Sequence, residues 1–370
     1  MIYLDNASTT MHKPRAVYNM LYNYAKKHGA NASRGAYKES IRSTEVIVDT
    51  QNICAKLFNI KTPQNIIFTQ NATYALNTAI LGTLKKDDHA IITQMEHNSV
   101  LRPVNARCEY TVAKADATGF VSPQNIENEI RSNTKLIIVN HASNVCGTIQ
   151  DIEKISQIAK KHNIKILIDT AQTAGILNID NAVLDADFIA FSGHKGLMGP
   201  MGTGGLYIKN PDDTSPLVYG GTGSESQSIY QPSLMPDKFH CGTQNIPALA
   251  ALCEGVKFVL NTGINKIYNH ENELALYLKN ELKSIKGVKV YGNENAIGNV
   301  AFNIKTLDSG ESVNLLANFA LRAGYHCAPL AHLALGTHKT GTVRASVGMF
   351  NTKRDINALI NSVNKIVKTV

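Results

Sequence analysis

The feature that most constrains this 370-residue chain is a series of short apolar runs separated by segments of helical periodicity. Apolar strands that alternate with helices are typical of a mainly parallel sheet covered by helices on both faces. The segment "DIEKISQIAKKHN" (151–163) is one such helix, and Asp151 is its expected N-cap. The sequence therefore predicts an α/β domain. Its predicted strands are "NIIFT" (65–69), "HAIIT" (89–93), "EYTVA" (109–113), "KLIIVNH" (135–141), "KILIDTA" (165–171), "FIAFSGH" (188–194) and "GGLYIK" (204–209).

The C-terminal part of the chain follows a different pattern. A long helical segment, 264–285, precedes two short strand-like runs at 288–292 and 299–304. A terminal helix then presents one apolar stripe, and together these elements indicate a compact α+β domain. We expect a large domain over residues 15–255 and a smaller α+β domain made of 1–14 and 256–370. The stripe consists of Ile356, Leu359, Ile360, Val363, Ile366 and Val367.

Composition indicates a globular protein. Apolar residues make up 44% and charged residues 18%, so a substantial core is expected and disorder is not. The N-terminus "MIYLDNASTT" reaches Asp5 before any apolar run develops, unlike a signal peptide. No stretch approaches the apolar length that spans a bilayer, so we expect no membrane association.

Cysteine spacing and charge distribution exclude further classes. The six cysteines form no CxxC pair, which argues against a zinc site or a disulfide framework and favours a reduced, cytoplasmic setting. The net charge of +8 is spread over short lysine pairs, whereas a nucleic-acid-binding protein would concentrate it. We therefore expect no metal and no nucleic-acid partner.

Polar residues follow several predicted strands at their carboxyl ends, where parallel sheets bind ligands. Ala72 and Thr73 lead into a helix whose free N–H groups and hydroxyl suit a phosphate, although an ordinary helix cap has the same pattern. His97 is either a surface histidine or a ring stacked on a flat ligand. Asn144 belongs to the same edge.

The last two strand ends give the sharpest chemical signal. Asp169 closes one strand, with Gln172 after it, and the next strand delivers Ser192, His194 and Lys195. A lysine at the end of a buried strand is costly unless it is paired or neutralised. A carboxylate and a lysine can bracket pyridoxal phosphate: the lysine forms a Schiff base, and the carboxylate holds the ring nitrogen protonated.

Ten motifs, in order along the chain, resemble the class V aminotransferase group of pyridoxal-phosphate enzymes and, within it, the cysteine desulfurases and selenocysteine lyases. The resemblance covers essentially the whole chain. It implies fold type I, with a seven-stranded sheet in the large domain, and a homodimer with active sites at the subunit interface. The motifs are "LDNASTT" (4–10), "FTQNATYALN" (68–77), "EHNSV" (96–100), "ASNVCGT" (142–148), "IDTAQTAG" (168–175), "FSGHK" (191–195), "GGTGSES" (220–226), "CGTQNIPALAAL" (241–252), "RAGYHCAPL" (322–330) and "VRASVGMFNT" (343–352).

The resemblance also implies roles around the cofactor ring. Lys195 would bind the cofactor covalently, Asp169 would pair with the ring nitrogen, and Gln172 would hydrogen-bond the ring hydroxyl. His97 would stack on the ring and help to move protons, with Asn144 near the substrate.

Other matching positions would hold the cofactor's phosphate. The resemblance places Ala72, Thr73, Ser192 and His194 around it, joined by Thr222 from the partner subunit.

Two further residues concern the substrate. Arg344 would bind its carboxylate, for which a guanidinium fork is suited, and "TVRASVG" otherwise reads as a buried strand. "RAGYHCAPLAH" resembles the desulfurases with a short loop, and Cys327 would be the reactive cysteine at the matching position. The alternative is that Cys327 is an ordinary buried thiol, which is the more common case for a lone cysteine. His326 and Arg322 nearby favour the reactive interpretation. The continuation "APLAHLALGTHKTGT" departs from the family pattern, and the chain is shorter than typical members.

The function predicted from these residues is that of a cysteine desulfurase. It would convert L-cysteine to L-alanine and leave a persulfide on Cys327 for transfer to an acceptor protein. The nearest alternative is a selenocysteine lyase acting on L-selenocysteine, and an aminotransferase or another β-lyase is more distant. An alternative of a different class is a non-catalytic sulfur-relay protein, against which the retention of Asp169, Lys195, Arg344 and Cys327 argues.

Overall fold

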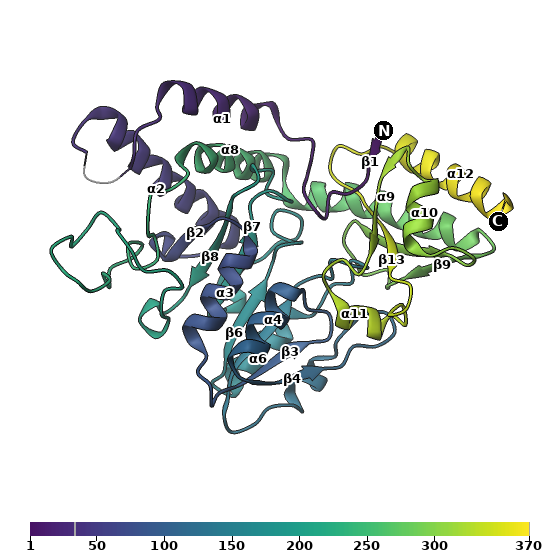
Figure 1. Cartoon of the computed structure of the whole chain (residues 1–370), viewed down its shortest axis with the longest axis horizontal. Coiled ribbons are helices and arrows are strands. Elements are labelled where there is room, and N and C mark those ends of the chain that lie inside the picture. The colour runs from purple at the N-terminus through teal and green to yellow at the C-terminus, as the bar shows by residue number, and fades with distance from the viewer. Residues whose placement is uncertain (33–34, 370) are drawn as a thin grey trace.

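A computed structural model describes residues 1–32 and 35–369. Its largest element is a seven-stranded sheet in the order β2-β8-β7-β6-β5-β3-β4, in which only β8 runs antiparallel to its neighbours. All seven predicted strands are present, which confirms the predicted α/β sheet (Figure 1). They are β2 Ile66–Thr69, β3 His89–Thr93, β4 Glu109–Ala113, β5 Thr134–Asn140, β6 Lys165–Asp169, β7 Phe188–Ser192 and β8 Gly204–Ile208.

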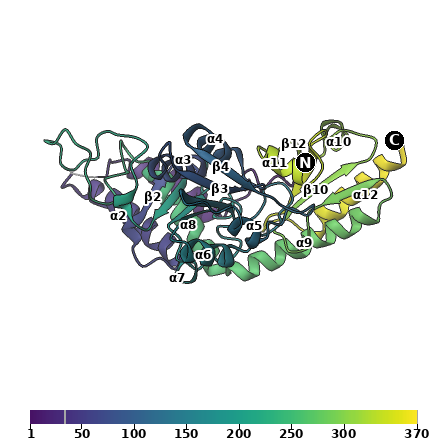
Figure 2. The ribbon, with the colours of Figure 1, turned by 90° about the horizontal axis from the view of Figure 1, so that it is seen from below.

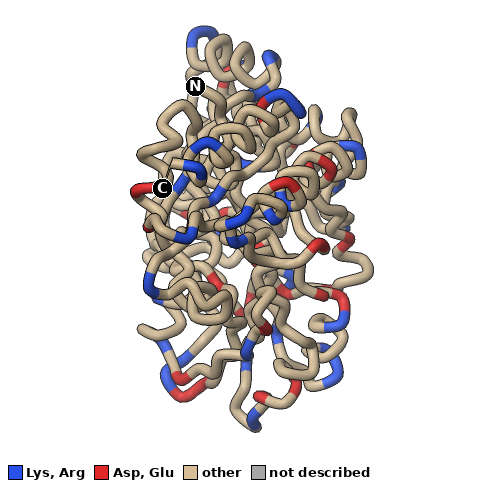
Figure 3. Tube along the Cα trace, turned by 90° about the vertical axis from the view of Figure 1, so that its right-hand side faces the viewer, with Lys and Arg blue, Asp and Glu red and all other residues tan. Residues whose placement is uncertain are grey.

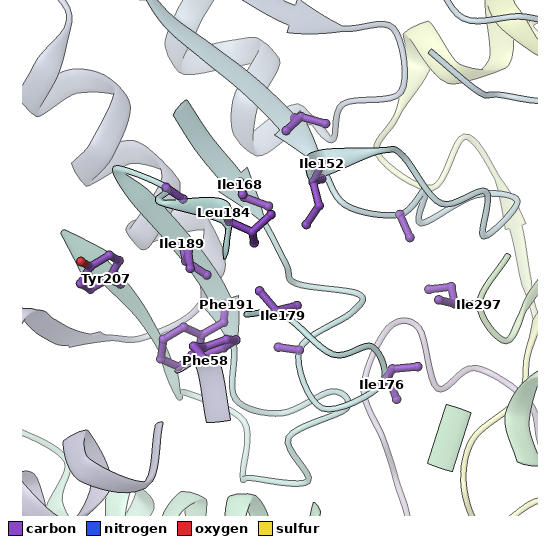
Figure 4. Packing of buried hydrophobic residues seen from close by; sticks show 14 of the residues in the cluster. Phe58, Ile152, Ile168, Ile176, Ile179, Leu184, Ile189, Phe191, Tyr207 and Ile297 are labelled. Atoms are coloured by element: carbon purple, nitrogen blue, oxygen red, sulfur yellow. The ribbon is translucent and has the colours of Figure 1, made fainter. Parts of the chain in front are cut away.

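Helices cover both faces of this sheet. Successive side chains of a strand point to opposite faces, so Ile166 and Ile168 join one apolar cluster while Leu167 joins another. The first cluster includes residues of α2, α6 and α8, and Figure 4 shows Phe58 of α2 against Phe191, with ring centroids 5.3 Å apart. The second is covered by α3 and α4. The helices are α1 Arg15–Lys27, α2 Lys38–Phe58, α3 Ala72–Thr83, α4 Asn98–Arg107, α5 Pro123–Glu127, α6 Ile152–Lys161, α7 Asn181–Leu184 and α8 Ile246–Thr262, with 3₁₀ turns at Pro63–Asn65 and Pro211–Asp213.

The C-terminal part forms a second sheet of four antiparallel strands, β12-β13-β10-β9, backed by α9 and α12 (Figure 2). Ile356, Leu359 and Val363 of the predicted stripe are fully buried against it. The elements are α9 Ile264–Ser284, β9 Val288–Tyr291, β10 Asn299–Ile304, α10 Ser309–Leu315, β11 Phe319–Ala320, β12 Arg322–Gly324, α11 Pro329–Ala334, β13 Thr342–Ser346 and α12 Lys353–Thr369.

The N-terminal segment lies against this second sheet, which is otherwise formed by residues of the C-terminal part of the chain (Figure 1). Strand β1, Ile2–Tyr3, pairs in parallel with β11, and Leu4 is fully buried in the C-terminal core. The backbone N–H of Asn6 donates to the carbonyl of Ser346 at the end of β13. This contact places the side chains of residues 5–10 beside β13 and Lys195.

Charged positions are mixed over the surface. Lys and Arg alternate with Asp and Glu along the trace in Figure 3 rather than forming one continuous basic band. In the described ranges, no helix combines the length and apolarity needed to cross a membrane. The same residues contain no group of three or more His, Cys, Asp or Glu arranged to hold a metal ion.

Candidate active site

The carboxyl ends of the large sheet surround a cavity that gathers most of the predicted residues. Helix α3 begins at Ala72 after β2, α4 begins after His97, Asp169 ends β6 and Ser192 ends β7. Strand order explains this, because neighbouring parallel strands end at one edge. The cavity is lined by Ala72, Thr73, His97, Asn144, Asp169, Gln172, Ser192, His194 and Lys195, together with Asn71, Leu76, Ser99, Asn140, Ala142 and Ala171.

Lys195 and Asp169 form the charged centre of the cavity. Burial lowers the pKa of Lys195 to about 8, and the Asp169 carboxylate opposes this effect. Burial raises the pKa of Asp169, while the backbone N–H of Ala171 (2.9 Å) and Lys195 both oppose the rise. An amine whose pKa lies near neutrality can be present as a free base, which is the form that attacks a carbonyl carbon.

His97 is a neutral ring fixed by the start of α4. Its Nδ1 accepts the backbone N–H of Ser99 at 3.0 Å, so a neutral ring carries its proton on Nε2. Burial, followed by the positive charge of Lys195, lowers the pKa of His97 to about 4. The ring therefore lines the cavity without a charge at neutral pH.

The opposite side of the cavity has the chemistry of an anion site. The N-terminus of α3 is joined by Ser192 Oγ and His194 Nδ1, which are buried and lack hydrogen-bond partners among the described residues. Thr73 Oγ1 lies 2.7 Å from Ser99 Oγ. Unpartnered buried polar atoms are uncommon unless a ligand or water satisfies them, and a helix N-terminus attracts anions. These residues, with Lys195 and Asp169, fit pyridoxal phosphate.

Gln172 reaches across to the N-terminal segment. Its Nε2 donates to the Ala7 carbonyl at 3.0 Å, while its Oε1 lies 3.5 Å from Asn299 Nδ2. The side chain, which lines the cavity, is thus held by the N-terminal segment and by β10 of the second sheet.

Arg344 is buried on β13, as its strand pattern predicted, with a side chain only 3% exposed. Nη1 donates to the backbone carbonyl of Asn144 at 2.8 Å, and Nη2 donates to Asp5 Oδ1 at 2.9 Å and to Ser8 Oγ at 2.7 Å. Its buried Nε has no partner in the part of the chain that the structure describes. The guanidinium therefore keeps donor capacity for a further anion.

Cys327 is exposed, and its loop is tied to the large sheet. The backbone N–H of Asn98 donates to the Cys327 carbonyl at 2.7 Å, and Asn144 Nδ2 donates to the His326 carbonyl at 2.6 Å. His326 and Cys327 have φ values of 48° and 58°, a left-handed conformation that non-glycine residues seldom adopt. These contacts hold the backbone of Cys327 beside the start of α4, next to His97 at the edge of the cavity, although Cys327 is not itself among the lining residues.

His326 is the neighbour of Cys327 in the sequence, but its ring carries no positive charge. Burial, followed by the charge of Arg344, lowers the pKa of His326 to about 3, and its Nε2 lies 3.1 Å from the Thr342 carbonyl. The ring is therefore neutral. The cations that interact with Cys327 are Arg322 and Arg344.

Thr222 does not reach the cavity of its own chain. It lines a separate hollow beside α2, with Gly221, Gly223 and His240, and its Oγ1 lies 3.3 Å from Ser224 Oγ. The prediction that Thr222 reaches the phosphate site of a partner subunit stays a prediction.

Two acidic residues of the site had no predicted role. Glu96 is fully buried below the cavity, where Oε1 accepts bonds from Thr93 Oγ1 (2.6 Å) and Asn140 N (2.9 Å), and burial raises its pKa to about 8. Asp5 binds Arg344. Both lie in motifs of the family resemblance, Glu96 in "EHNSV" and Asp5 in "LDNASTT". The feature of the sequence that could have indicated a role for them is an acidic residue close to an apolar run.

Comparison with known proteins agrees with this geometry. The family model described as aminotransferase class-V matches residues 2–359. The chain is 35% identical to a probable cysteine desulfurase of Methanothermobacter thermautotrophicus, covering 99% of this chain and 94% of that protein. It is 33% identical to one of Halalkalibacterium halodurans, covering 99% and 93%. Among solved structures, a cysteine desulfurase from Thermococcus onnurineus NA1 superposes with a TM-score of 0.94 (31% identity, covering 100% and 95%). One from Escherichia coli superposes with a TM-score of 0.90 (27% identity, covering 100% and 95%).

Proposed function

The chain belongs to the class-V aminotransferase family, and we propose that it is a pyridoxal-phosphate-dependent cysteine desulfurase. The observation that carries the proposal is an exposed cysteine, Cys327, fixed at the rim of a cavity that contains Lys195 and Asp169. The net reaction converts L-cysteine and the Cys327 thiol into L-alanine and a Cys327 persulfide. The substrate's C–S bond breaks, an S–S bond forms on Cys327, and no external oxidant or reductant is needed.

Four residues of the chain have separate roles in the proposed reaction. Pyridoxal phosphate held on Lys195 supplies an electron sink for negative charge at the substrate's Cα. The Asp169 carboxylate would pair with the ring nitrogen of that group, and the pKa of Lys195, about 8, lets this amine accept and release a proton near neutrality. Arg344 binds the substrate carboxylate through donors left free by its internal bonds. Cys327 receives the sulfur.

His97 and the phosphate-side residues orient the bound group. The neutral His97 ring can stack on a flat cofactor without repelling the protonated ring nitrogen. Ser192 and His194 offer the unpartnered Oγ and Nδ1 to the phosphate, beside the N–H groups of Ala72 and Thr73 at the start of α3. Gln172 and Asn144 complete the wall that faces the second sheet.

The working unit is a homodimer in which Thr222 completes the phosphate site of the neighbouring chain. Two features support this arrangement: Thr222 lies outside its own cavity, and several large apolar side chains between residues 218 and 234 are exposed. Exposed apolar patches mark interaction surfaces. Sedimentation at micromolar concentration should give the mass of two chains, and a fully active monomer would contradict the dimer. The exposed side chains are Val218, Tyr219, Ile229, Tyr230 and Leu234.

We propose the domain limits given above, 15–255 for the cofactor-binding domain and 1–14 with 256–370 for the smaller domain.

The surface position of Cys327 supports delivery of its sulfur to an acceptor protein. Six free cysteines support a reducing, cytoplasmic setting.

The decisive experiment uses mass spectrometry after brief exposure of the holoenzyme to L-cysteine. One added sulfur should appear on the peptide that carries Cys327, with one alanine formed per sulfur transferred. Cys327→Ala should keep the yellow colour and stop sulfide formation, whereas Cys241→Ala, a matched cysteine outside the cavity, should behave like the wild type. Sulfur on another cysteine, or normal desulfuration by Cys327→Ala, would refute the proposal.

L-Selenocysteine provides the test of the neighbouring activity. If Cys327→Ala still releases selenium at the wild-type rate and the wild type barely acts on L-cysteine, the protein is a selenocysteine lyase. A purified protein that cannot be loaded with cofactor would instead support the sulfur-relay alternative.

A further inference from the structure

The segment that follows Cys327, "APLAHLALGTHKTGT" (328–342), contains a fully buried histidine, His332. The segment forms the short helix α11 and the loop that leads into β13 (Figure 1). None of its residues, all of which the structure describes, lines the cavity that contains Lys195. A polar ring is seldom buried completely unless it makes specific contacts, so the contacts of His332 indicate what it does.

Cys327 itself lies in a tight turn that its residues do not favour. The Ala328 N–H donates to the Tyr325 carbonyl at 2.9 Å, and the two residues between them, His326 and Cys327, have φ values of 48° and 58°. Turns with two successive positive φ values normally contain glycine, asparagine or aspartate, because most other side chains are strained there. The turn must therefore be held by the structure around it.

His332 contacts the two residues that precede Cys327. Its ring meets the Tyr325 ring edge to face, with centroids 5.2 Å apart, and its centroid lies 5.8 Å from that of His326. Burial lowers the pKa of His332, and an interaction with the backbone of Tyr325 opposes the fall, so the ring is neutral at pH 7. His332 thus packs against the turn without adding a charge to it.

His332 is in turn held by Thr337. Its Nδ1 lies 2.7 Å from Thr337 Oγ1, and its carbonyl accepts the Thr337 N–H at 2.8 Å. The Thr337 carbonyl accepts the Gly341 N–H at 2.8 Å, and the following residue, Thr342, places its Oγ1 3.0 Å from His326 Nε2. The contacts therefore run from His332 to the start of β13 and back to His326 inside the turn.

The large sheet constrains a different part of the same turn. Asn98 and Asn144 bind the carbonyls of Cys327 and His326, whereas His332 packs against the side chains of His326 and Tyr325. Loss of His332 would leave the two carbonyls bound but would let these side chains repack. A displacement of about 1 Å at a reacting group can lower a rate about a hundredfold.

We propose that His332 is a positioning residue for Cys327 and that Thr337 holds it in this role. The inference rests on the proposed function, in which the Cys327 thiol receives the substrate sulfur. Because His332 is not among the residues that line the cavity, it acts through the conformation of the turn. Its loss should slow sulfur transfer while leaving the binding of the amino acid unchanged.

The test separates sulfur transfer from amino-acid binding. The holoenzyme is mixed rapidly with L-cysteine, and the Cys327 persulfide is quantified by mass spectrometry at early times. Affinity for L-alanine, which carries no sulfur, is measured through the visible absorption of the cofactor. In His332→Leu, persulfide formation should be slower by about tenfold or more, whereas the affinity for L-alanine should change by less than about twofold.

Two substitutions at Thr337 isolate its hydroxyl group. Thr337→Val keeps the shape but not the hydroxyl and should slow persulfide formation about threefold, whereas Thr337→Ser keeps the hydroxyl and should remain close to the wild type. His338→Leu is the matched control, because His338 is an exposed histidine of the same loop. The control keeps the His338 backbone carbonyl, which accepts the Tyr325 hydroxyl at 2.7 Å, and it should behave like the wild type.

Hydrogen exchange gives a measurement that does not depend on turnover. The Ala328 N–H is protected by its bond across the turn, so its exchange should be about tenfold faster in His332→Leu and unchanged in His338→Leu. Wild-type persulfide formation in both His332→Leu and Thr337→Val would overturn the inference. So would an equal loss of L-alanine affinity and sulfur transfer, which is the result expected of a general structural defect.

If His332→Leu does not retain cofactor, the comparison of Thr337→Val with Thr337→Ser decides, and equal rates of persulfide formation would refute the role of the pair. Failure of the proposed desulfurase would look different. The wild-type holoenzyme itself would then place no sulfur on Cys327, while the exchange of the Ala328 N–H would still respond to His332→Leu.

Discussion

Replacing Arg344 by alanine should weaken substrate binding far more than cofactor binding. The substitution removes the donors that a substrate carboxylate would use, and a hydrogen bond to a charged group contributes about 1.5–3 kcal/mol. This free energy corresponds to an increase of about ten- to a hundredfold in the apparent dissociation constant of L-cysteine. Arg344→Lys keeps the charge but not the planar fork, so its effect should be intermediate.

The same substitution has a structural cost that must be measured separately. The Asn144 carbonyl loses its 2.8 Å donor, while Asp5 keeps Arg322 and Ser8 as partners. A buried group left without its partner costs about 1–3 kcal/mol of unfolding free energy. Thermal unfolding of the holoenzyme gives this loss, and visible absorption gives the fraction of protein that holds cofactor.

Steady-state kinetics with L-cysteine then separates binding from stability. The expected result is a raised KM, near-normal cofactor content and a modestly lower melting temperature. Arg354→Ala, at the exposed start of α12, is the matched control and should resemble the wild type. Loss of cofactor with unchanged substrate affinity would show that Arg344 is not the carboxylate anchor.

Three other substitutions test the centre of the cavity. Lys195→Ala should abolish turnover and the covalent link, and borohydride reduction with peptide mapping of the wild type should label Lys195 and no other lysine. Asp169→Asn should keep cofactor bound but lower turnover at least a hundredfold, because a neutral amide cannot hold the ring nitrogen protonated; wild-type turnover would make Asp169 purely structural. Glu96→Gln tests a buried neutral acid: a folded pKa of about 8, above the ordinary 4.5, makes the wild type lose stability as pH rises between these values. The variant should lack that slope of about 1.4 kcal/mol per pH unit, and identical pH dependence in denaturant titrations of both proteins would refute the assignment.

The large sheet was predictable because most of its strands are buried on both faces and therefore appear in the sequence as largely apolar runs, although the edge strand β4 is only partly buried. The smaller elements were not. β1, β11 and β12 have two or three residues each, too few to display a period in the sequence. β1 and β11 exist through their pairing with each other, which joins residues 2–3 to residues 319–320, whereas β12 pairs with β13.

The cavity residues were predictable for a related reason: a parallel sheet brings its strand ends together whatever the loops contain. Contacts between segments that are far apart in the sequence escape that argument. The bond from Asn144 to the His326 carbonyl and the one from Arg344 to Asp5 join residues 182 and 339 positions apart. The charge state of His326 is likewise set by tertiary burial, which lowers its pKa to about 3 and which its place in the sequence does not reveal.

The way Cys327 is held determines how its sulfur can leave. Both carbonyls of the loop, at His326 and Cys327, are bound by groups of the large sheet's edge, and the two residues share a left-handed conformation that only the surrounding structure maintains. Moving the backbone so that it carries the thiol outward would break these hydrogen bonds, and rotation about the side chain moves sulfur by only a few ångströms, about the reach of one S–S bond. Because Cys327 is nevertheless exposed, under the proposed function a nucleophile of an acceptor would have to come to Cys327, beside Asn98 and Tyr325. Sulfur transfer would then require motion of the acceptor rather than of the Cys327 backbone.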